Sequence, residues 1–223
     1  MKNNYVILSN KIWNCDLAEI LSRRYEANWS FLSELNVHRI NDLNPSIIFV
    51  VNWSEMIAAD IIERFPCIVF HETDLPFGRG GSPIQNLICR GIKNTKISAL
   101  KATLKVDAGP VYLKKDLPLY GTIEEIGIRS NDIVADMIVE ILQKKISPKT
   151  QKGEITKFKR RKPSDGILSS VDSLDKAYDL IRMLDGEGYP NAFLETESFR
   201  LEFSRASIKC ENEIIADVRI TKK

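Results

Sequence analysis

The stretch Ile47–Val51 (Ile-Ile-Phe-Val-Val) decides the fold class of this chain of 223 residues. Its five apolar residues follow one another without a polar interruption, as expected for a strand that is covered on both faces of a sheet. A second run of this kind, Cys67–Phe70, comes next, and the isoleucines at positions 57, 61 and 62 between the two runs have helical spacing. A strand, a helix and a strand in this order predict parallel strands joined by a right-handed crossover.

The same alternation continues on both sides of this unit. Strands are predicted over residues 5–8 and 29–32, with helical spacing between them. Toward the C-terminus the pattern predicts a short helix after Pro83, strands over 96–104 and 111–117, and a long amphipathic helix ending near Lys145. That helix opens with Thr122-x-x-Glu125, which is a capping box. The expected fold class is therefore α/β with a mostly parallel sheet.

A change of composition divides the chain into two units. Residues 147–154 are polar, contain proline and glycine, and are typical of a linker. Residues 1–146 form the predicted α/β domain, and residues 155–223 are expected to form a small C-terminal α+β subdomain. In that subdomain the pattern predicts a helix over 174–184 and short strands over 192–194, 199–203 and 214–220. Its apolar strands are a candidate homodimer surface.

Charge, cysteine content and hydropathy argue against several classes of function. The formal net charge of +2 is too small to argue for a polyanionic partner, because nucleic-acid-binding proteins usually carry a strong basic excess. The four cysteines lack metal-ligand spacing, so reduced thiols and no metal site are expected. The N-terminus lacks the apolar run of a signal peptide, and no segment approaches the roughly 20 apolar residues that cross a bilayer. We therefore expect a cytoplasmic protein without membrane contact.

Ligands of parallel sheets bind beyond the carboxyl ends of the strands, where the loop after Phe70 begins. This loop reads His71-Glu-Thr-Asp-Leu-Pro-Phe-Gly-Arg-Gly-Gly-Ser-Pro83. Its glycines let the backbone approach a ligand closely, and its prolines stiffen the loop. Histidine exchanges protons near neutral pH, and the carboxylate of Asp107, which opens an Asp-Ala-Gly-Pro segment, would orient the imidazole. The alternative is that His71 has a structural role and that the Asp107 segment is only a turn. The second histidine, His38, is expected at the surface or in packing.

The two segments together resemble the formyltransferases that use N10-formyltetrahydrofolate. The signature of that family is a His-x-Ser/Thr-x-Leu-Pro-x-x-Arg-Gly loop, followed by an Asp-Ala-Gly-Pro turn at about this distance. The resemblance implies a Rossmann-like catalytic domain with the folate site over residues 1–146. It implies His71 as the general base that also stabilises the formyl oxygen, Asp107 as its assistant, N10-formyltetrahydrofolate as the cofactor, and no metal.

The resemblance also implies two sets of ligand contacts. The expected folate contacts are Trp53, Met56, Ile57, Arg79, Gly80, Gly81, Pro83, Leu104, Lys105 and Val106. The expected acceptor contacts are Trp13, Asn14, Thr73, Arg160 and Arg161. Packing and turn roles remain the alternative for Trp13 and Asn14, and a solvated basic face remains the alternative for residues 159–162.

One position departs from the family pattern. Most members have an asparagine two residues before the catalytic histidine, and Val69 stands there in this chain. Asn52, at the end of the preceding strand, and Asn86, after Pro83, are the candidates to supply an amide in its place. An oxyanion stabilised mainly by His71 is the third possibility.

The C-terminal unit bears on the acceptor. Residues 158–167, followed by 179–192, resemble the segment after the catalytic domain in methionyl-tRNA and sugar-nucleotide formyltransferases. Methionyl-tRNA enzymes are usually longer and more basic, so we expect a nucleotide-linked 4-amino-4,6-dideoxy sugar of a bacterial surface pathway, of pseudaminic-acid type. Nucleic acid is then not expected as a partner. A methionyl-tRNA or purine-pathway formyltransferase and a non-catalytic folate-binding protein are the alternatives.

Overall fold

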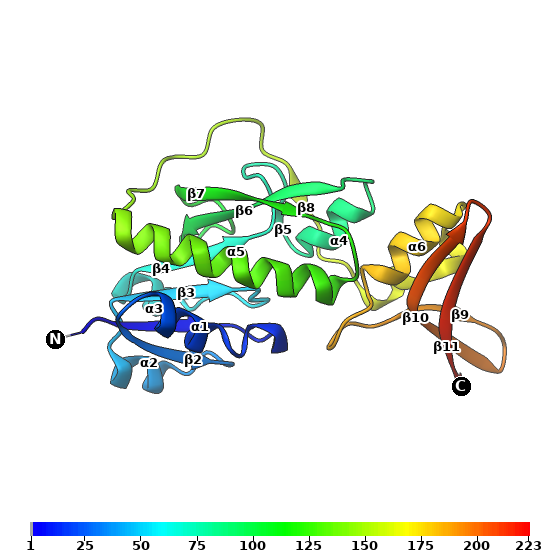
Figure 1. Ribbon diagram of the computed structural model, residues 1–223, viewed down its shortest axis with the longest axis horizontal. Coiled ribbons are helices and arrows are strands. Elements are labelled where there is room, and N and C mark those ends of the chain that lie inside the picture. The colour runs from blue at the N-terminus through cyan, green and yellow to red at the C-terminus, as the bar shows by residue number, and fades with distance from the viewer. Residues whose placement is uncertain (1) are drawn as a thin grey trace.

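The computed structural model describes residues 2–223 and has a six-stranded sheet at its centre (Figure 1). In spatial order the strands are β2 (Asn28–Leu32), β1 (Asn4–Leu8), β3 (Ile47–Val51), β4 (Cys67–His71), β6 (Asn94–Lys101) and β7 (Val111–Pro118). The first four are parallel, β6 is antiparallel to β4, and β7 is antiparallel to β6. The predicted Rossmann-like, mostly parallel sheet is confirmed.

The helices that cover the sheet follow the predicted pattern with one addition. They are α1 (Leu17–Arg24), α2 (Val37–Leu43), α3 (Ala59–Arg64), α4 (Pro83–Ile88) and α5 (Ile123–Lys144), with a short 3-10 turn at Ile12–Asn14. The capping box at the start of α5 is present: Thr122 Oγ1 accepts from the Glu125 amide, and the Glu125 carboxylate accepts from the Thr122 amide. Helix α2 was not predicted, although its apolar residues Val37, Ile40 and Leu43 stand three positions apart.

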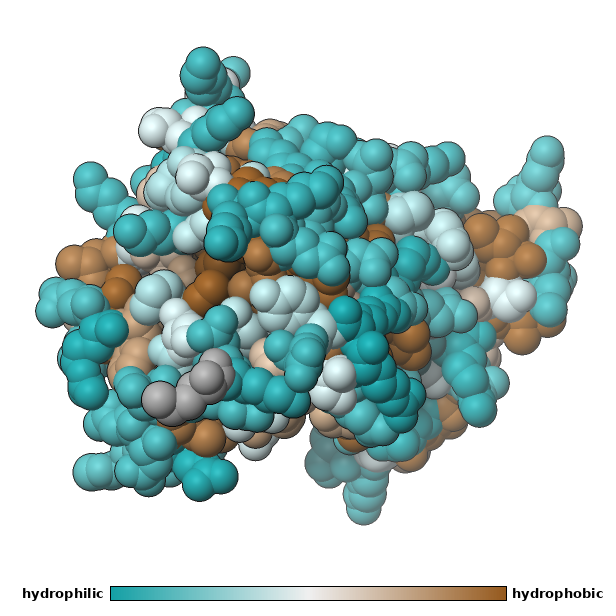
Figure 2. Space-filling model, turned by 60° about the vertical axis from the view of Figure 1, so that its left-hand side comes forward, coloured by the Kyte–Doolittle hydropathy of each residue, from teal (hydrophilic) through white to brown (hydrophobic). Residues whose placement is uncertain are grey.

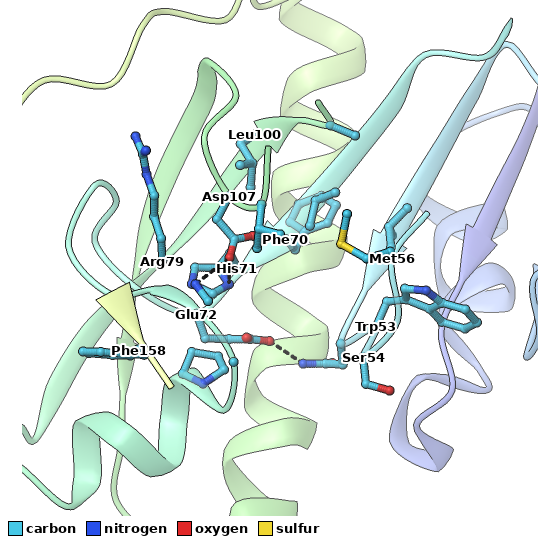
Figure 3. Close-up of a pocket in the computed structure, with 18 of the residues that line it drawn as sticks. Trp53, Ser54, Met56, Phe70, His71, Glu72, Arg79, Leu100, Asp107 and Phe158 are labelled. Atoms are coloured by element: carbon cyan, nitrogen blue, oxygen red, sulfur yellow. Dashed lines mark hydrogen bonds and ion pairs between the residues drawn. The ribbon is translucent and has the colours of Figure 1, made fainter. Parts of the chain in front are cut away.

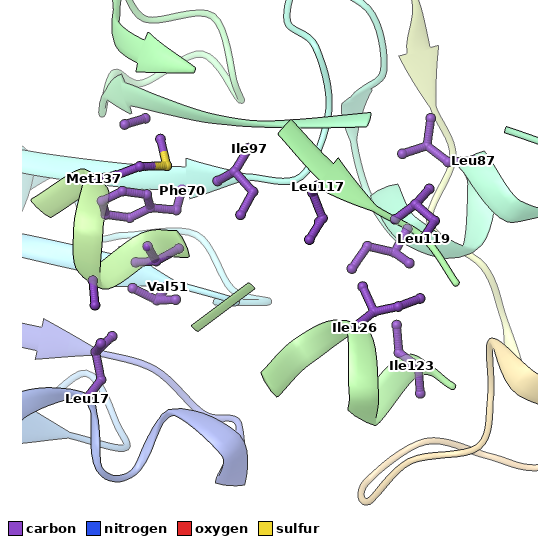
Figure 4. Close-up of a cluster of buried hydrophobic side chains, with 14 of the residues drawn as sticks. Leu17, Val51, Phe70, Leu87, Ile97, Leu117, Leu119, Ile123, Ile126 and Met137 are labelled. Atoms are coloured by element: carbon purple, nitrogen blue, oxygen red, sulfur yellow. The ribbon is translucent and has the colours of Figure 1, made fainter. Parts of the chain in front are cut away.

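Two apolar layers hold the sheet between these helices. On one face, Phe49, Val51 and Phe70 pack with residues of α1 and α5, among them Leu17 and Met137 (Figure 4). On the other face, the alternate residues of β1 and β3 pack with α2 and α3. Each fully buried aliphatic or aromatic side chain contributes about 1.5–3 kcal/mol to folding. The apolar runs read in the sequence therefore form the core that fixes the strand ends.

Strand β6 ends at Lys101, earlier than the predicted strand over residues 96–104. The following segment leaves the sheet as a turn that places Asp107 in a left-handed backbone conformation, with φ of 51°. The turn closes at Gly109, where a Cβ would lie 1.8 Å from the Lys101 carbonyl oxygen. Only glycine fits this close approach, so the Asp-Ala-Gly-Pro segment is a turn folded back on the end of β6.

The C-terminal unit lies at one end of the sheet (Figure 1). It contains the 3-10 turns Pro163–Gly166 and Leu168–Ser170, helix α6 (Leu174–Arg182) and an antiparallel sheet of β9 (Ala192–Glu195), β10 (Phe199–Cys210) and β11 (Glu213–Lys222). Strand β10 continues well beyond the predicted end at residue 203. At the start of the predicted subdomain, strand β8 (Lys157–Phe158) pairs in parallel with β5 (Arg79–Gly80) in the His71 loop. The expected boundaries of linker and subdomain stay a prediction.

The surface is largely hydrophilic in the view of Figure 2, with hydrophobic patches between the polar side chains. Among residues 2–223 no helix is long and apolar enough to cross a membrane. All four cysteines are free thiols. No group of three or more histidine, cysteine and acidic side chains is placed to hold a metal ion in the described part of the chain.

Candidate functional site

A cavity of about 1000 Å³ opens at the carboxyl ends of β3 and β4. Its wall is formed by the loop after β3, the end of β4, the glycine-rich loop, the turn after β6 and residues around Arg160. These segments are far apart in the sequence. The parallel strands β3 and β4 bring the loops that follow them to one edge of the sheet, whereas antiparallel β6 ends beside the start of β4 and its turn reaches the cavity from there. Figure 3 shows the side chains of His71, Glu72 and Asp107 together at this wall.

His71 is the last residue of β4 and is almost fully buried, with 6% of its surface exposed. Its Nε2 lies 2.8 Å from the Gly78 carbonyl oxygen. Because a carbonyl oxygen only accepts, Nε2 must carry a hydrogen. Nδ1 lies 3.7 Å from Asp107 Oδ2, which is an electrostatic contact too long for a hydrogen bond. The imidazole is therefore oriented by its own loop, with Nδ1 directed toward the carboxylate.

Asp107 is held by backbone and side chains from two other segments. Its Oδ2 accepts a hydrogen bond of 2.8 Å from the Gly80 amide. The side-chain amide of Gln151 donates to the carbonyl oxygens of Asp107 and Gly109, and its oxygen accepts from Arg79. Gln151 thus ties the glycine-rich loop to the Asp107 turn, which fixes the carboxylate beside His71.

The glycine-rich loop is locked by the segment that follows Gln151. The Phe158 ring packs edge-on against Phe77 at 5.4 Å between centroids, and the Gly81 amide donates to the Phe158 carbonyl oxygen. A Cβ at Gly80 would lie 2.4 Å from that oxygen. The close approach explains why glycine stands at this position.

Glu72, the residue after His71, is a buried acid in the same wall, with 5% of its surface exposed. One of its carboxylate oxygens accepts a hydrogen bond from the side-chain amide of Asn52. The Asn52 oxygen in turn accepts from the Trp13 indole N–H at 3.4 Å. Burial raises the pKa of Glu72 above its ordinary value, and the nearby His71 opposes that rise.

Lys11 and Tyr189 close this end of the cavity. The Lys11 ammonium lies 4.0 Å from the centroid of the Tyr189 ring, and the Trp13 and Tyr189 rings are nearly parallel at 6.2 Å. Burial lowers the pKa of Lys11 and raises the pKa of Tyr189 to about 12. Tyr189 belongs to the C-terminal unit, so that unit contributes directly to the wall.

The structure brings most of the predicted site residues to the cavity and leaves others outside it. The cavity wall contains His71, Asp107, Asn52, Trp53, Met56, Ile57, Arg79, Gly80, Gly81, Pro83, Lys105, Val106 and Arg160. The predicted residues that do not line it are Asn86, Leu104, Trp13, Asn14, Thr73 and Arg161. Whether the lining residues bind folate or acceptor stays a prediction.

The residues outside the wall have structural contacts that explain their positions. The Asn86 amide donates to the carbonyl oxygens of Gly81, Ser82 and Lys159, so it holds loops together and does not face the cavity. Asn14 is buried between Ser9 and Asn131. Leu104 is exposed in its turn, whereas Thr73 is fully buried. The Arg161 guanidinium donates to the Cys89 sulfur and to the Asp165 carbonyl oxygen. Trp13 contacts the cavity wall through Asn52, whose side-chain oxygen accepts a hydrogen bond from the Trp13 indole N–H.

Glu72, Lys11 and Tyr189 were missed by the sequence reasoning. Glu72 belongs to the His71 loop, and a carboxylate next to the predicted catalytic histidine is a signal that the sequence carries. Lys11 and Tyr189 carry no local signal, because they meet only in the folded chain.

Comparison with known proteins identifies both parts of the chain. Residues 11–142 match the family model described as formyl transferase, and residues 163–221 match the model of the C-terminal domain of methionyl-tRNA formyltransferase. A solved structure named methionyl-tRNA formyltransferase, from Clostridium thermocellum, is 48% identical with a TM-score of 0.94, covering 99% of this chain and 100% of that one.

A curated relative of the same name, from Thermodesulfovibrio yellowstonii, is 29% identical over 196 residues. The match covers 80% of this chain and 64% of that protein. The chain spans 64%, 57% and 46% of the lengths of the first three curated relatives, so each of these relatives is longer than the region that matches.

These relatives contradict two expectations from the sequence. The expected acceptor, a nucleotide-linked amino sugar, is wrong, and so is the expectation that nucleic acid is no partner, because the relatives are named for methionyl-tRNA. A formyltransferase from Anoxybacillus kamchatkensis solved with a UDP-linked formamido sugar is only 16% identical, with a TM-score of 0.56, covering 70% of this chain and 85% of that one. A likeness at that identity shows the fold alone.

Proposed function

Because this chain belongs to the formyl transferase family, we propose that it formylates the amino group of methionyl-tRNA, with N10-formyltetrahydrofolate as the formyl donor. One observation carries the choice of acceptor. The Clostridium thermocellum structure that bears this name aligns with the chain from end to end at 48% identity. A charged tRNA and a reduced folate meet in the cytoplasm, where we expect the enzyme to act.

N10-formyltetrahydrofolate is the donor of this family, and the cavity wall fits it. The Trp53 indole N–H is buried in the wall without a hydrogen-bond partner among residues 2–223, so it offers a donor to a ligand. Val50, Phe70 and Leu100 supply the apolar surface that a flat ring requires. When bound, the donor supplies a formyl carbon attached to a nitrogen leaving group.

His71 takes up the proton that the amine loses as it attacks this carbon. Its Nε2 is occupied by the Gly78 carbonyl oxygen, so Nδ1 is the nitrogen that takes up a proton. The Asp107 carboxylate, 3.7 Å away, stabilises the imidazolium that results. The Gly80 amide keeps that carboxylate in position during the transfer.

The charges of the cavity wall favour an anionic acceptor. Its basic side chains are Lys11, Arg79, Lys101, Lys105, Lys157 and Arg160, whereas its acidic side chains are Glu55, Glu72 and Asp107. The wall therefore carries a local basic excess that the net charge of +2 conceals. Such an excess attracts the phosphates at the end of a tRNA.

The test is a turnover assay with N10-formyltetrahydrofolate and methionyl-tRNA. After release of the amino acid from the tRNA, mass spectrometry should detect formylmethionine. Free methionine and UDP-linked 4-amino sugars serve as competing acceptors and should give far less product. Formylation of one of these acceptors, without formylmethionine from the tRNA, would refute the proposed acceptor while keeping the reaction class.

A further inference from the structure

Glu72 is a buried carboxylate that the proposed function leaves without a role. It is 5% exposed, follows His71 directly, and lines the cavity. Figure 3 shows its side chain below the imidazole, directed toward the loop that carries Trp53 and Ser54. A buried acid beside a catalytic histidine requires an explanation, because burying a carboxylate costs free energy unless the charge is paired.

No lysine or arginine of the described residues forms an ion pair with Glu72. Among residues 2–223, its one side-chain hydrogen bond comes from the neutral Asn52 amide. The charged and titratable groups near it are the preceding residue His71, Asp107 from the turn, and Lys11 and Tyr189 at the end of the cavity. Lys11 lies over the Tyr189 ring, so its ammonium is engaged with that ring.

A purely structural role would not need a charge at this position. Glutamine has the same length and would accept the Asn52 hydrogen bond without the desolvation cost of a carboxylate. Asn52 itself is held in a left-handed conformation, with φ of 48°, and its oxygen is tied to Trp13. The contacts thus hold one carboxylate oxygen in place and leave the carboxylate free to receive a cation from the cavity.

We propose that Glu72 is a catalytic base that binds the ammonium form of the acceptor amine and removes its first proton. The assignment rests on the proposed function, since it concerns the amine of the same reaction. An α-amine with an ordinary pKa of about 7.7–8.0 arrives at neutral pH largely as an ammonium ion, which cannot attack a carbonyl carbon. A carboxylate at the end of the cavity pairs with that ammonium ion and supplies the buried cation that the site lacks.

The proton balance of the reaction needs two acceptors, and the site then holds two. The ammonium nitrogen loses one proton to Glu72, with one N–H bond broken and one O–H bond formed, and this proton passes to solvent by the end of the cycle. The nitrogen loses a second proton as its bond to the formyl carbon forms. His71 Nδ1 takes that second proton and returns it to the folate nitrogen that leaves, so the net products are a formamide, tetrahydrofolate and one proton.

The test is the pH dependence of methionyl-tRNA formylation by Glu72→Gln. At pH 7 the variant should lose about 10²- to 10⁴-fold in kcat/KM, the usual contribution of a general base. Its remaining activity should rise about tenfold per pH unit up to the pKa of the free amine, because only neutral amine reacts. The wild-type profile should be flatter over this range. Glu63→Gln removes an exposed glutamate of α3 outside the cavity and should match the wild type.

A binding measurement separates loss of the base from loss of structure. Wild-type protein should bind methionyl-tRNA more tightly than a tRNA that carries the 2-hydroxy analogue of methionine, and Glu72→Gln should lose this preference. A variant with wild-type kcat/KM and wild-type pH profile would overturn the role of Glu72 and leave the proposed function intact. Wild-type protein without turnover on methionyl-tRNA would overturn the proposed function and this assignment with it.

Discussion

The Gly78 carbonyl oxygen occupies Nε2 of His71, so Nδ1 is the ring nitrogen that exchanges a proton in the proposed function. The loop that follows β4 therefore selects the reactive atom of the proposed catalytic residue. Asp107 adds a negative charge at 3.7 Å from Nδ1 without forming a hydrogen bond to it. In the proposed function this contact matters most when the imidazole is charged.

His71→Asn should abolish turnover without unfolding the protein. Asparagine removes the proton acceptor while leaving an amide of similar size near Gly78, so we expect kcat to fall about 10³-fold. His38→Asn, an exposed change on α2, is the matched control. Circular dichroism and thermal unfolding should not distinguish the variants. Substantial residual activity of His71→Asn would remove His71 from the mechanism.

Glu72→Gln should be at least as stable as the wild type at pH 7. Burial raises the pKa of Glu72 in the folded protein above the ordinary 4.5, so the folded state holds its proton more strongly than the unfolded chain. The stability contributed by protonated Glu72 is fully present below pH 4.5 and is lost as the pH rises through the folded pKa. Urea unfolding should show that the free energy of unfolding of the variant, relative to the wild type, is higher at pH 7 than at pH 4. The opposite trend would mean that the buried charge stabilises the fold.

At the scale of elements, the segment from Gln151 to Phe158 joins the two halves of the site. Gln151 bonds Arg79 and the Asp107 turn, and β8 pairs with β5 in the glycine-rich loop. The sequence identified both loops, because each has a local signature of glycine, proline and a polar residue after a strand. It described residues 147–154 only as a linker, because a side chain that bridges two distant loops leaves no local pattern.

Gln151→Ala should reduce activity more than stability. Loss of its four hydrogen bonds frees the Asp107 turn to move relative to His71, and a misplacement of about 1 Å can cost about 100-fold in rate. We expect a fall of this order at most in kcat, with a small change in the midpoint of unfolding. Gln143→Ala, an exposed change on α5, is the control. Equal activity of the two variants would show that Phe158 and β8 suffice to hold the loop.

At the scale of the whole molecule, the distribution of charge matters more than its sum. The net charge of +2 led to the wrong expectation about nucleic acid, since it averages basic residues at the cavity with acidic residues elsewhere. Only the fold gathers the six cations of the wall on one face. A charge count over the whole sequence could not reveal this grouping.

Methionyl-tRNA formylation should weaken as salt is added. Each phosphate contact releases counterions, so kcat/KM should fall linearly on logarithmic axes, and Arg160→Ala should reduce the slope by about one. Lys144→Ala, at the far end of α5 from the capping box, should keep the wild-type slope. The slope follows from kcat/KM measured between low and physiological ionic strength. Activity that does not respond to salt would contradict phosphate contacts at the cavity wall.

The sequence by itself determined the α/β class, the strands that carry the site and the His71 and Asp107 motifs, because apolar periodicity and turn chemistry are local properties of the chain. Tertiary structure decided which side chains meet. It turned Asn86 toward backbone carbonyls, joined Gln151 to two loops, and brought Lys11, Glu72 and Tyr189 to one end of the cavity. Those placements depend on contacts between residues far apart in the sequence, and the strand order and packing of the folded sheet alone create them.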